Sequence, residues 1–348
     1  MKNRFAYRIV ALAILACAAI ACTVIARSLP PDPNNPTGSH GLILVDKLGS
    51  RVRFLNPDTY SELSNLDVGA RPHEMAISPD HKTAYVSVYG DGVYGNNPHP
   101  GHNIAVIDLA SRQITKMIDV SPYIAPHGIM VDPSGKRLYV TCDLSRKLLI
   151  INTSTGVTEA AIDTVGTGHW ITMLPDASKV YVANKNESPF ISVIDLKTRK
   201  LVAKVPMPNG TQGIVASPDG KHVLAVDFVV PQIVVINTVD DTVADKVTLQ
   251  SDDHAAFRVR YTPDGSRIMT TTETTSLVNI INPNDLHGVQ SVLTVGKSPM
   301  GIGFAANGET ALVANHGDGT VSVLDLKGDA KVLSNFKAGT GIETIAYY

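Results

Sequence analysis

The sequence predicts an all-β protein, a seven-bladed β-propeller with four-stranded blades, and three observations lead to this fold class. A short turn phrase of the Pro-Asp-Gly kind recurs at nearly even spacing. The segments around each turn have the composition of strands and follow one order. Two incomplete units at the ends of residues 41–348 complement each other. A period in the forties with several short strands per unit is typical of propeller blades.

The turn phrase occurs six times, as "SPDH", "DPSG", "LPDA", "SPDG", "TPDG" and "AANG". The second residues of these phrases lie at positions 79, 133, 175, 218, 263 and 306, so the intervals are 54, 42, 43, 45 and 43 residues. One interval is longer because "YGDGVYGNNPHPGHN" (89–103) is inserted. The spacing therefore defines six complete units, one of which carries a long loop.

Each unit contains four segments that alternate with turn residues. In one unit "GIVAS" (213–217) leads into the turn, "VLAVD" and "QIVVIN" follow it, and a more polar segment completes it. Valine, isoleucine and tyrosine are concentrated in these segments, as expected for strands. No long segment with a 3.6-residue period occurs outside the N-terminal region, so we expect almost no helix.

The two end fragments predict a seventh blade. Residues 41–69 supply three strands without the first, and residues 341–348 supply a first strand without the rest. We therefore expect the ring to be closed by the N-terminal strands plus the C-terminal strand, which removes its open edge.

Two units carry a resemblance to a known family. The segments "VYVANKNESPFISVIDLKTRKLVAKV" (180–205) and "ALVANHGDGTVSVLDL" (311–326) resemble the repeats of YVTN-type β-propeller proteins, which include YncE-like bacterial proteins of the periplasm. The resemblance covers essentially all of residues 41–348 and implies the same fold. Repeats of this kind are signatures of a scaffold, so function has to be argued from the site.

The N-terminal residues 1–26 read as a signal peptide. Lys2, Arg4 and Arg8 precede a short apolar run, and small residues follow it, as in a secretory signal. Residues 27–40, rich in Pro and Asn, read as a flexible linker. We therefore expect an exported protein, located in the periplasm or at the cell surface.

The segment "AIAC" (19–22) leaves two kinds of processing open. It resembles a bacterial lipobox, which would place a lipid anchor on Cys22, although Ala stands at its first position. The alternative is ordinary cleavage after Ala21 or Ala26.

Cys142, the one cysteine of the predicted propeller, has no partner for a disulfide and reads as a small buried strand residue.

Charge and composition limit the partners. The net charge of −2 gives no electrostatic footprint for nucleic acid, so we expect none as a partner. A membrane is expected only through the lipid on Cys22. The chain reads as a monomer that binds a small ligand or a protein partner at one face of the propeller.

Three histidines share one place in the repeat. His73, His127 and His169 each lie six residues before the second residue of a turn phrase, in three consecutive units. Propeller topology puts these positions at the start of innermost strands, near the central axis. Neutral imidazole suits Cu or Zn, so these three residues are the candidate metal ligands, with packing or hydrogen-bonding roles as the alternative.

Other residues map to the same face. These are His99 and His102 in the insertion, His254 and His316 in later loops, and Arg258, which alternation places on one side of its strand together with Arg260. We treat them as candidates for a ligand or partner face; for the arginines a salt-bridged structural role is the alternative.

The sequence predicts an exported binding or interaction module with a ligand or metal site on the histidine-bearing face near the axis. The alternatives are a metal-dependent hydrolase or lyase, or a redox-associated enzyme, that uses the same face, and a cell-surface scaffold without a small ligand. No nucleophile elbow, zinc-protease helix or isolated carboxylate pair is present in the sequence, which favours binding over catalysis.

Overall fold

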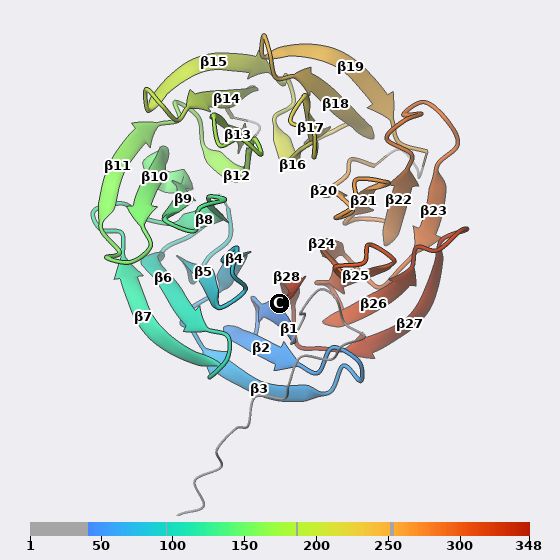
Figure 1. Cartoon of the computed structure of the whole chain (residues 1–348), viewed down its shortest axis with the longest axis horizontal. Coiled ribbons are helices and arrows are strands. Elements are labelled where there is room, and N and C mark those ends of the chain that lie inside the picture. The colour runs from blue at the N-terminus through green and yellow to red at the C-terminus, as the bar shows by residue number, and fades with distance from the viewer. Residues whose placement is uncertain (1–40, 95, 186, 251–253) are drawn as a thin grey trace, which may run out of the picture. The chain divides into compact units, whose positions relative to one another are not determined.

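A computed structural model describes residues 41–348 except 95, 186 and 251–253. The predicted signal peptide (1–26), the linker (27–40) and Cys22 lie outside the described residues. Within them, seven four-stranded antiparallel sheets follow one another around a ring, with their first strands innermost (Figure 1). The predicted seven-bladed β-propeller with four-stranded blades is confirmed.

The blades are numbered here in chain order. Blade 1 contains β4 (Pro72–Ile77), β5 (Thr83–Gly90), β6 (Pro100–Asp108) and β7 (Gln113–Asp119). Blade 2 contains β8 (Pro126–Val131), β9 (Arg137–Cys142), β10 (Lys147–Asn152) and β11 (Thr158–Asp163). Blade 3 contains β12 (Gly168–Met173), β13 (Lys179–Asn184), β14 (Phe190–Asp195) and β15 (Lys200–Pro206). Blade 4 contains β16 (Thr211–Ala216), β17 (His222–Asp227), β18 (Gln232–Asn237) and β19 (Thr242–Thr248).

The remaining blades follow the same plan. Blade 5 contains β20 (Arg258–Tyr261), β21 (Ile268–Thr272), β22 (Leu277–Ile281) and β23 (Ser291–Thr294). Blade 6 contains β24 (Pro299–Phe304), β25 (Thr310–Asn315), β26 (Thr320–Asp325) and β27 (Lys331–Lys337). Blade 7 contains β28 (Ile342–Tyr347), β1 (Leu42–Asp46), β2 (Arg51–Leu55) and β3 (Glu62–Asp67).

Blade 7 closes the ring with strands from both ends of the described chain. β28 pairs antiparallel with β1, and Leu42 lies opposite Tyr347. The backbone N–H of Gly41 also donates to the carbonyl of Tyr348 at 3.1 Å. This is the closure predicted from the two end fragments, and it leaves no inner strand unpaired in that blade.

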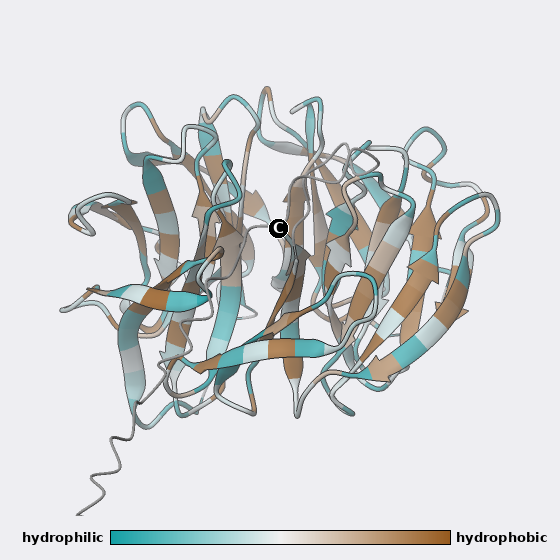
Figure 2. Ribbon diagram, turned by 60° about the horizontal axis from the view of Figure 1, so that its bottom comes forward, coloured by the Kyte–Doolittle hydropathy of each residue, from teal (hydrophilic) through white to brown (hydrophobic). Residues whose placement is uncertain are grey.

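The hydrophobic core lies between neighbouring blades. For example, Ile104 and Ile118 of blade 1 pack with Val140, Leu149 and Ile151 of blade 2 in one cluster. Similar clusters join the other neighbouring blades. Apolar and polar bands alternate along the outer strands, as the period of two requires for sheets that pack on each face (Figure 2).

The recurring turns have the geometry that their residues predict. Gly135 and Gly220 end the "DPSG" and "SPDG" turns with φ of 72° and 71°, the left-handed region that glycine adopts without steric cost. At the end of a third strand, Asp108 Oδ1 accepts the backbone N–H of Ser111 at 2.7 Å. The aspartates and asparagines that end third strands therefore cap turns, as their recurrence indicates.

Helix is almost absent from the described residues: one 3₁₀ turn, η1 (Asp143–Ser145), follows β9. None of the described helical segments is long and apolar enough to cross a membrane. Cys142 is fully buried with a free thiol at the end of β9, as predicted.

Candidate functional site

A bulge interrupts the start of most innermost strands. In β4 the register with β5 shifts between Pro72 and Met75, and β8, β12, β16 and β24 show the same irregularity. Such a bulge re-aims side chains that simple alternation would send to opposite faces. As a result the side chains of His73 and Glu74 both point toward the axis, at successive positions along it.

The structure brings the three predicted metal ligands together. The ring centroids of His73 and His127 lie 4.7 Å apart, and those of His127 and His169 lie 3.5 Å apart. All three are buried, and the Tyr89 ring packs against both His73 and His127. We call His73, His127 and His169 the histidine tier.

The histidine tier is neutral at physiological pH. Burial lowers the pKa of His73 to about 3, assisted by the charge of Lys47. Burial also lowers the pKa of His127 and His169 well below the ordinary value. His73 Nδ1 lies 3.1 Å from the carbonyl of Arg71, whereas the buried Nδ1 atoms of His127 and His169 have no hydrogen-bond partner.

Hydroxyl groups from neighbouring blades hold the tier in place. Ser87 Oγ donates to the carbonyl of His127 at 2.7 Å, and Thr141 Oγ1 donates to that of His169 at 2.6 Å. Thr344 Oγ1 lies 3.1 Å from the carbonyl of His73. These bonds anchor the backbone of each histidine to the adjacent blade, so the relative positions of the rings are set by blade packing.

Glu343 takes the corresponding position in blade 7, and the sequence analysis missed it. Its Oε2 atom lies 3.3 Å from Lys47 Nζ and 3.4 Å from His316 Nδ1. Although burial opposes ionisation, the charges of Lys47, His73 and His316 lower the pKa of Glu343 to about 2. Of the predicted face residues, His316 thus reaches the axis as a partner of Glu343.

A second set of axial residues directly follows second strands; His316 of this set was predicted, whereas Asp143 and Lys185 were missed. Asp143 accepts a hydrogen bond from the Tyr89 hydroxyl at 2.9 Å, and its Oδ2 lies 3.9 Å from His169 Nδ1. Burial raises the pKa of Asp143 to about 7. Burial lowers the pKa of Lys185 to about 8, against the attraction of Asp143.

The long insertion of blade 1 crosses toward blade 3. The Tyr94 hydroxyl donates to Glu187, and it lies 3.3 Å from Thr167 Oγ1. The Tyr94 ring lies 5.7 Å from the His169 ring, and Lys185 Nζ lies 4.9 Å from the Tyr94 ring. The insertion therefore covers the His169 end of the tier with an aromatic side chain.

The other predicted histidines of this face do not join the tier. His99 pairs with Asp91 at 2.5 Å and its side chain is 83% exposed, while His102 pairs with Asp119 at 3.0 Å. His254 is exposed in the loop before β20. These three lie on the rim, outside the buried cluster.

Next to the histidine tier, three side chains from different blades form what we call the polar layer: Glu74, Trp170 and Arg258. Glu74 Oε1 accepts Trp170 Nε1 at 2.8 Å and Arg258 NH2 at 2.9 Å. The Arg258 guanidinium also lies 3.5 Å above the Trp170 ring. Arg258, predicted as a ligand-face residue with a salt bridge as the alternative, is therefore ion-paired across the axis.

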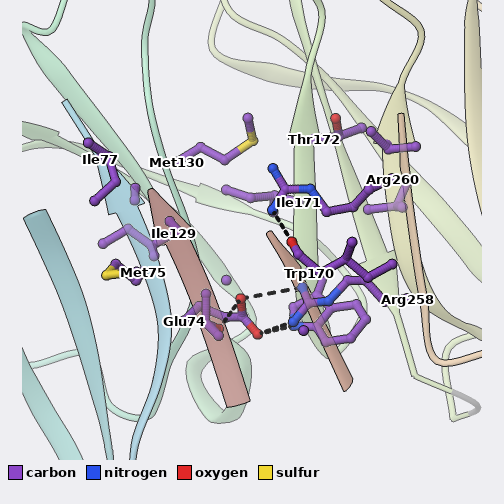
Figure 3. A pocket seen from close by; sticks show the side chains of 18 of the residues that line it. Glu74, Met75, Ile77, Ile129, Met130, Trp170, Ile171, Thr172, Arg258 and Arg260 are labelled. Atoms are coloured by element: carbon purple, nitrogen blue, oxygen red, sulfur yellow. Dashed lines mark hydrogen bonds and ion pairs between the residues drawn. The ribbon is translucent and has the colours of Figure 1, made fainter. Parts of the chain in front are cut away.

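A cavity of about 390 Å³ occupies the axis on the other side of the polar layer. Its walls come from all seven innermost strands, and Glu74, Trp170 and Arg258 form one end, with Arg260, Met130 and Thr172 further along (Figure 3). The cavity extends toward the end of the innermost strands at which the Pro-Asp-Gly turns lie. It is separate from the histidine tier, whose side chains do not line it.

The arrangement does not present a ready-made metal centre. Within the described part of the chain, no group of three or more His, Cys, Asp or Glu side chains is placed to hold a metal ion. The close approach of the His127 and His169 rings at 3.5 Å is that of stacked aromatic groups. Binding of one ion by all three imidazoles would require the rings to turn.

Comparisons with known proteins support the fold. No protein-family model and no curated protein matches the sequence. Among solved structures, Kuenenia stuttgartiensis hydrazine synthase is similar, with a TM-score of 0.69, 19% identity, and coverage of 79% of this chain and 89% of that chain. A functionally unknown protein from Desulfotomaculum acetoxidans DSM 771 gives a TM-score of 0.71, 15% identity, and coverage of 89% and 99%. At these identities the likeness shows the propeller fold alone, and the resemblance to YVTN-type proteins stays an expectation.

Proposed function

We propose that the chain is an exported binding module, related to YVTN-type propellers, that holds a Cu or Zn ion or a small ligand at the histidine-bearing face near its axis. One observation carries this proposal. Buried titratable groups with shifted pKa values are concentrated at one end of the axis, around His73, His127 and His169. Such concentrations are costly to bury and are typical of functional sites.

The chemistry of the tier favours a metal among the ligands. Metal ions bind the unprotonated imidazole, and the lowered pKa values keep these rings unprotonated at neutral pH. The Nδ1 atoms of His127 and His169 are buried without a hydrogen-bond partner, so each has a lone pair or an N–H group to offer. Coordination would satisfy them after a rotation of the rings.

The test is the metal content of mature protein purified without a histidine tag. Mass spectrometry should find close to one Cu or Zn per chain, and His127→Gln should abolish it. His222→Gln, at the start of β17 and outside the tier, is the matched control and should keep the metal. A metal-free protein whose melting temperature does not change with added Cu or Zn would contradict the metal form of the proposal.

A second candidate function is catalysis at the same face, and one observation favours it. A carboxyl group with a pKa of about 7 and an ammonium group with a pKa of about 8 lie in one electrostatically coupled cluster. These values suit a general acid and a general base near neutral pH. Hydrolysis of p-nitrophenyl acetate that Asp143→Asn and Lys185→Met both abolish would support an enzyme. Equal rates in the wild type and the variants would count against it.

Export can be tested separately. Expression of the full chain in a Gram-negative host should release the protein by osmotic shock if ordinary cleavage occurs. Incorporation of radiolabelled palmitate that Cys22→Ser abolishes would indicate the lipid-anchored form. Retention of the full-length chain in the cytoplasm would contradict export.

A further inference from the structure

The central cavity contains a cation that forms no ion pair among the described residues. Arg260, on β20, projects among the cavity walls, and its NH1 group donates to the carbonyl of Ile302 at 3.1 Å. Among the described residues no carboxylate lies within ion-pair distance of Arg260. The contrast with Arg258, two residues earlier, is direct, because Arg258 is paired with Glu74 at 2.9 Å.

Arg260 keeps its charge inside the cavity. Burial and the neighbouring charge of Arg258 lower the pKa of Arg260 to about 10, against the attraction of Glu74, so it stays protonated at neutral pH. Its surface is nevertheless accessible, which means that water or a ligand inside the cavity reaches the guanidinium. A guanidinium offers five N–H donors in a planar fork, and within the described residues NH1 is the group that donates a hydrogen bond.

Most of the other residues that line the cavity are apolar, although polar atoms also contribute to its surface. Met130, Ile302 and Ala346 contribute to the walls, and the indole of Trp170 lies at the end formed by the polar layer. The apolar walls would exclude a fully hydrated anion, whereas the arginine would favour one charged group. Small-molecule sites typically combine such walls with a few convergent polar groups.

We propose that the central cavity binds a small organic carboxylate with an apolar body, whose carboxylate pairs with the Arg260 guanidinium in the fork geometry and whose body packs on the Met130 and Ile302 walls. The volume of about 390 Å³ is that of a small-molecule site. The ligand reaches it from the face of the Pro-Asp-Gly turns. This site is separate from the histidine-bearing face and does not depend on the function proposed for that face.

Trp170 gives a direct readout, because it is the one tryptophan of the chain and lies in the cavity wall. Titration of octanoate into the mature protein should change the tryptophan emission saturably. Octan-1-ol, of the same length but without charge, should bind at least about tenfold more weakly, because it cannot form the charge-assisted hydrogen bonds.

Two variants separate binding from folding. Arg260→Gln should weaken octanoate binding about 10- to 100-fold while the melting temperature stays the same or rises. Ala346→Leu should block the cavity with Arg260 still present. Arg267→Gln is the matched control, since Arg267 lies beside the same group of turns and donates to the Gly328 carbonyl outside the cavity; it should bind octanoate like the wild type.

Three results would overturn the proposal. One is the absence of any change in emission at millimolar octanoate. Another is unchanged binding by Arg260→Gln. The third is binding of inorganic phosphate in place of octanoate, which would contradict the apolar body of the ligand.

Discussion

The histidine tier and the central cavity lie on opposite sides of the polar layer and are formed by the same seven innermost strands. On one side, buried charges are matched in pairs, such as Glu343 with Lys47, and aromatic rings fill the space. On the other side most wall residues are apolar, space is left open, and Arg260 has no ion-pair partner among the described residues. One repeat thus produces two environments, because the residues at the axis differ from blade to blade while the strands behind them do not.

The largest effect is expected at the boundary between the two regions. Glu74→Leu would leave Arg258 buried without its partner, so the free energy of unfolding should fall by about 3–5 kcal/mol. Urea denaturation followed by circular dichroism measures it. The double variant Glu74→Leu with Arg258→Met should recover most of the loss. A loss below about 1 kcal/mol in the single variant would mean that the ion pair of the polar layer does not stabilise the boundary between the two regions.

The two regions should also differ in their response to acid. The pKa of His73 is about 3 in the folded protein and 6.5 in the unfolded chain, so the unfolded chain binds the proton first as the pH falls. The contribution of His73 to the free energy of unfolding is therefore fully present above pH 6.5 and decreases toward pH 3. At pH 5 the free energy of unfolding is lower by about 2 kcal/mol because of this histidine, taking 1.36 kcal/mol per pH unit.

His73→Gln tests this, because glutamine is neutral and occurs at the same position in blade 4. The groups facing His73 that influence it are Lys47, Glu343 and His316. The variant should lose less stability between pH 7 and pH 5 than the wild type in urea denaturation, and His222→Gln should follow the wild type. Identical pH profiles for His73→Gln and the wild type would contradict a neutral tier.

A smaller effect is expected where the innermost strands come closest. A Cβ atom at Gly128 would lie 2.3 Å from the carbonyl oxygen of His169, so Gly128→Ala should push β8 and β12 apart and cost about 1–3 kcal/mol. Gly328→Ala is the control. Apart from its two chain neighbours, no atom of the described residues lies within 4 Å of the Cβ it would add, and its φ of 55° is what opposes alanine. Equal melting temperatures for both variants would exclude tight contact between the blades at this layer.

The smallest effect is expected inside the cavity. Arg260→Met removes a solvent-accessible cation that has no ion-pair partner among the described residues, so the free energy of unfolding should change by less than about 1 kcal/mol. Arg258→Met, measured in parallel, should destabilise the protein because it leaves Glu74 without its ion-pair partner. If Arg260→Met cost more than about 2 kcal/mol, the arginine would be structural and the contrast between the two sides would fail.

The sequence predicts the blades well because the signals that define the repeat are local. Turn residues, strand composition and the capping aspartates all act within a few residues, and the end fragments complete each other. Counting back six residues from the turn phrases identified His73, His127 and His169. Glu343 was missed because the last strand is not followed by a turn phrase from which to count, although "IETIAY" aligns with "PHEMAI" in the structure.

Other parts of the axis could not be derived from the sequence in the same way. Asp143 and Lys185 each follow a second strand by one residue, so that offset was the available signal. Glu74 reaches the axis only because a bulge interrupts the alternation of β4. The cavity depends on the summed volumes of side chains from seven blades, which no local pattern encodes.

The closing strand β28 has a consequence for the timing of both sites. It leaves the ribosome after all the other strands described here, yet it contributes Glu343 to one side of the polar layer and Thr344, which donates a hydrogen bond to Glu74 of the layer. Neither side has its full set of side chains until β28 pairs with β1. A ligand on either side would therefore bind the closed ring in preference to an opened one. It would stabilise the closed ring by a free energy that increases with ligand concentration, by mass action.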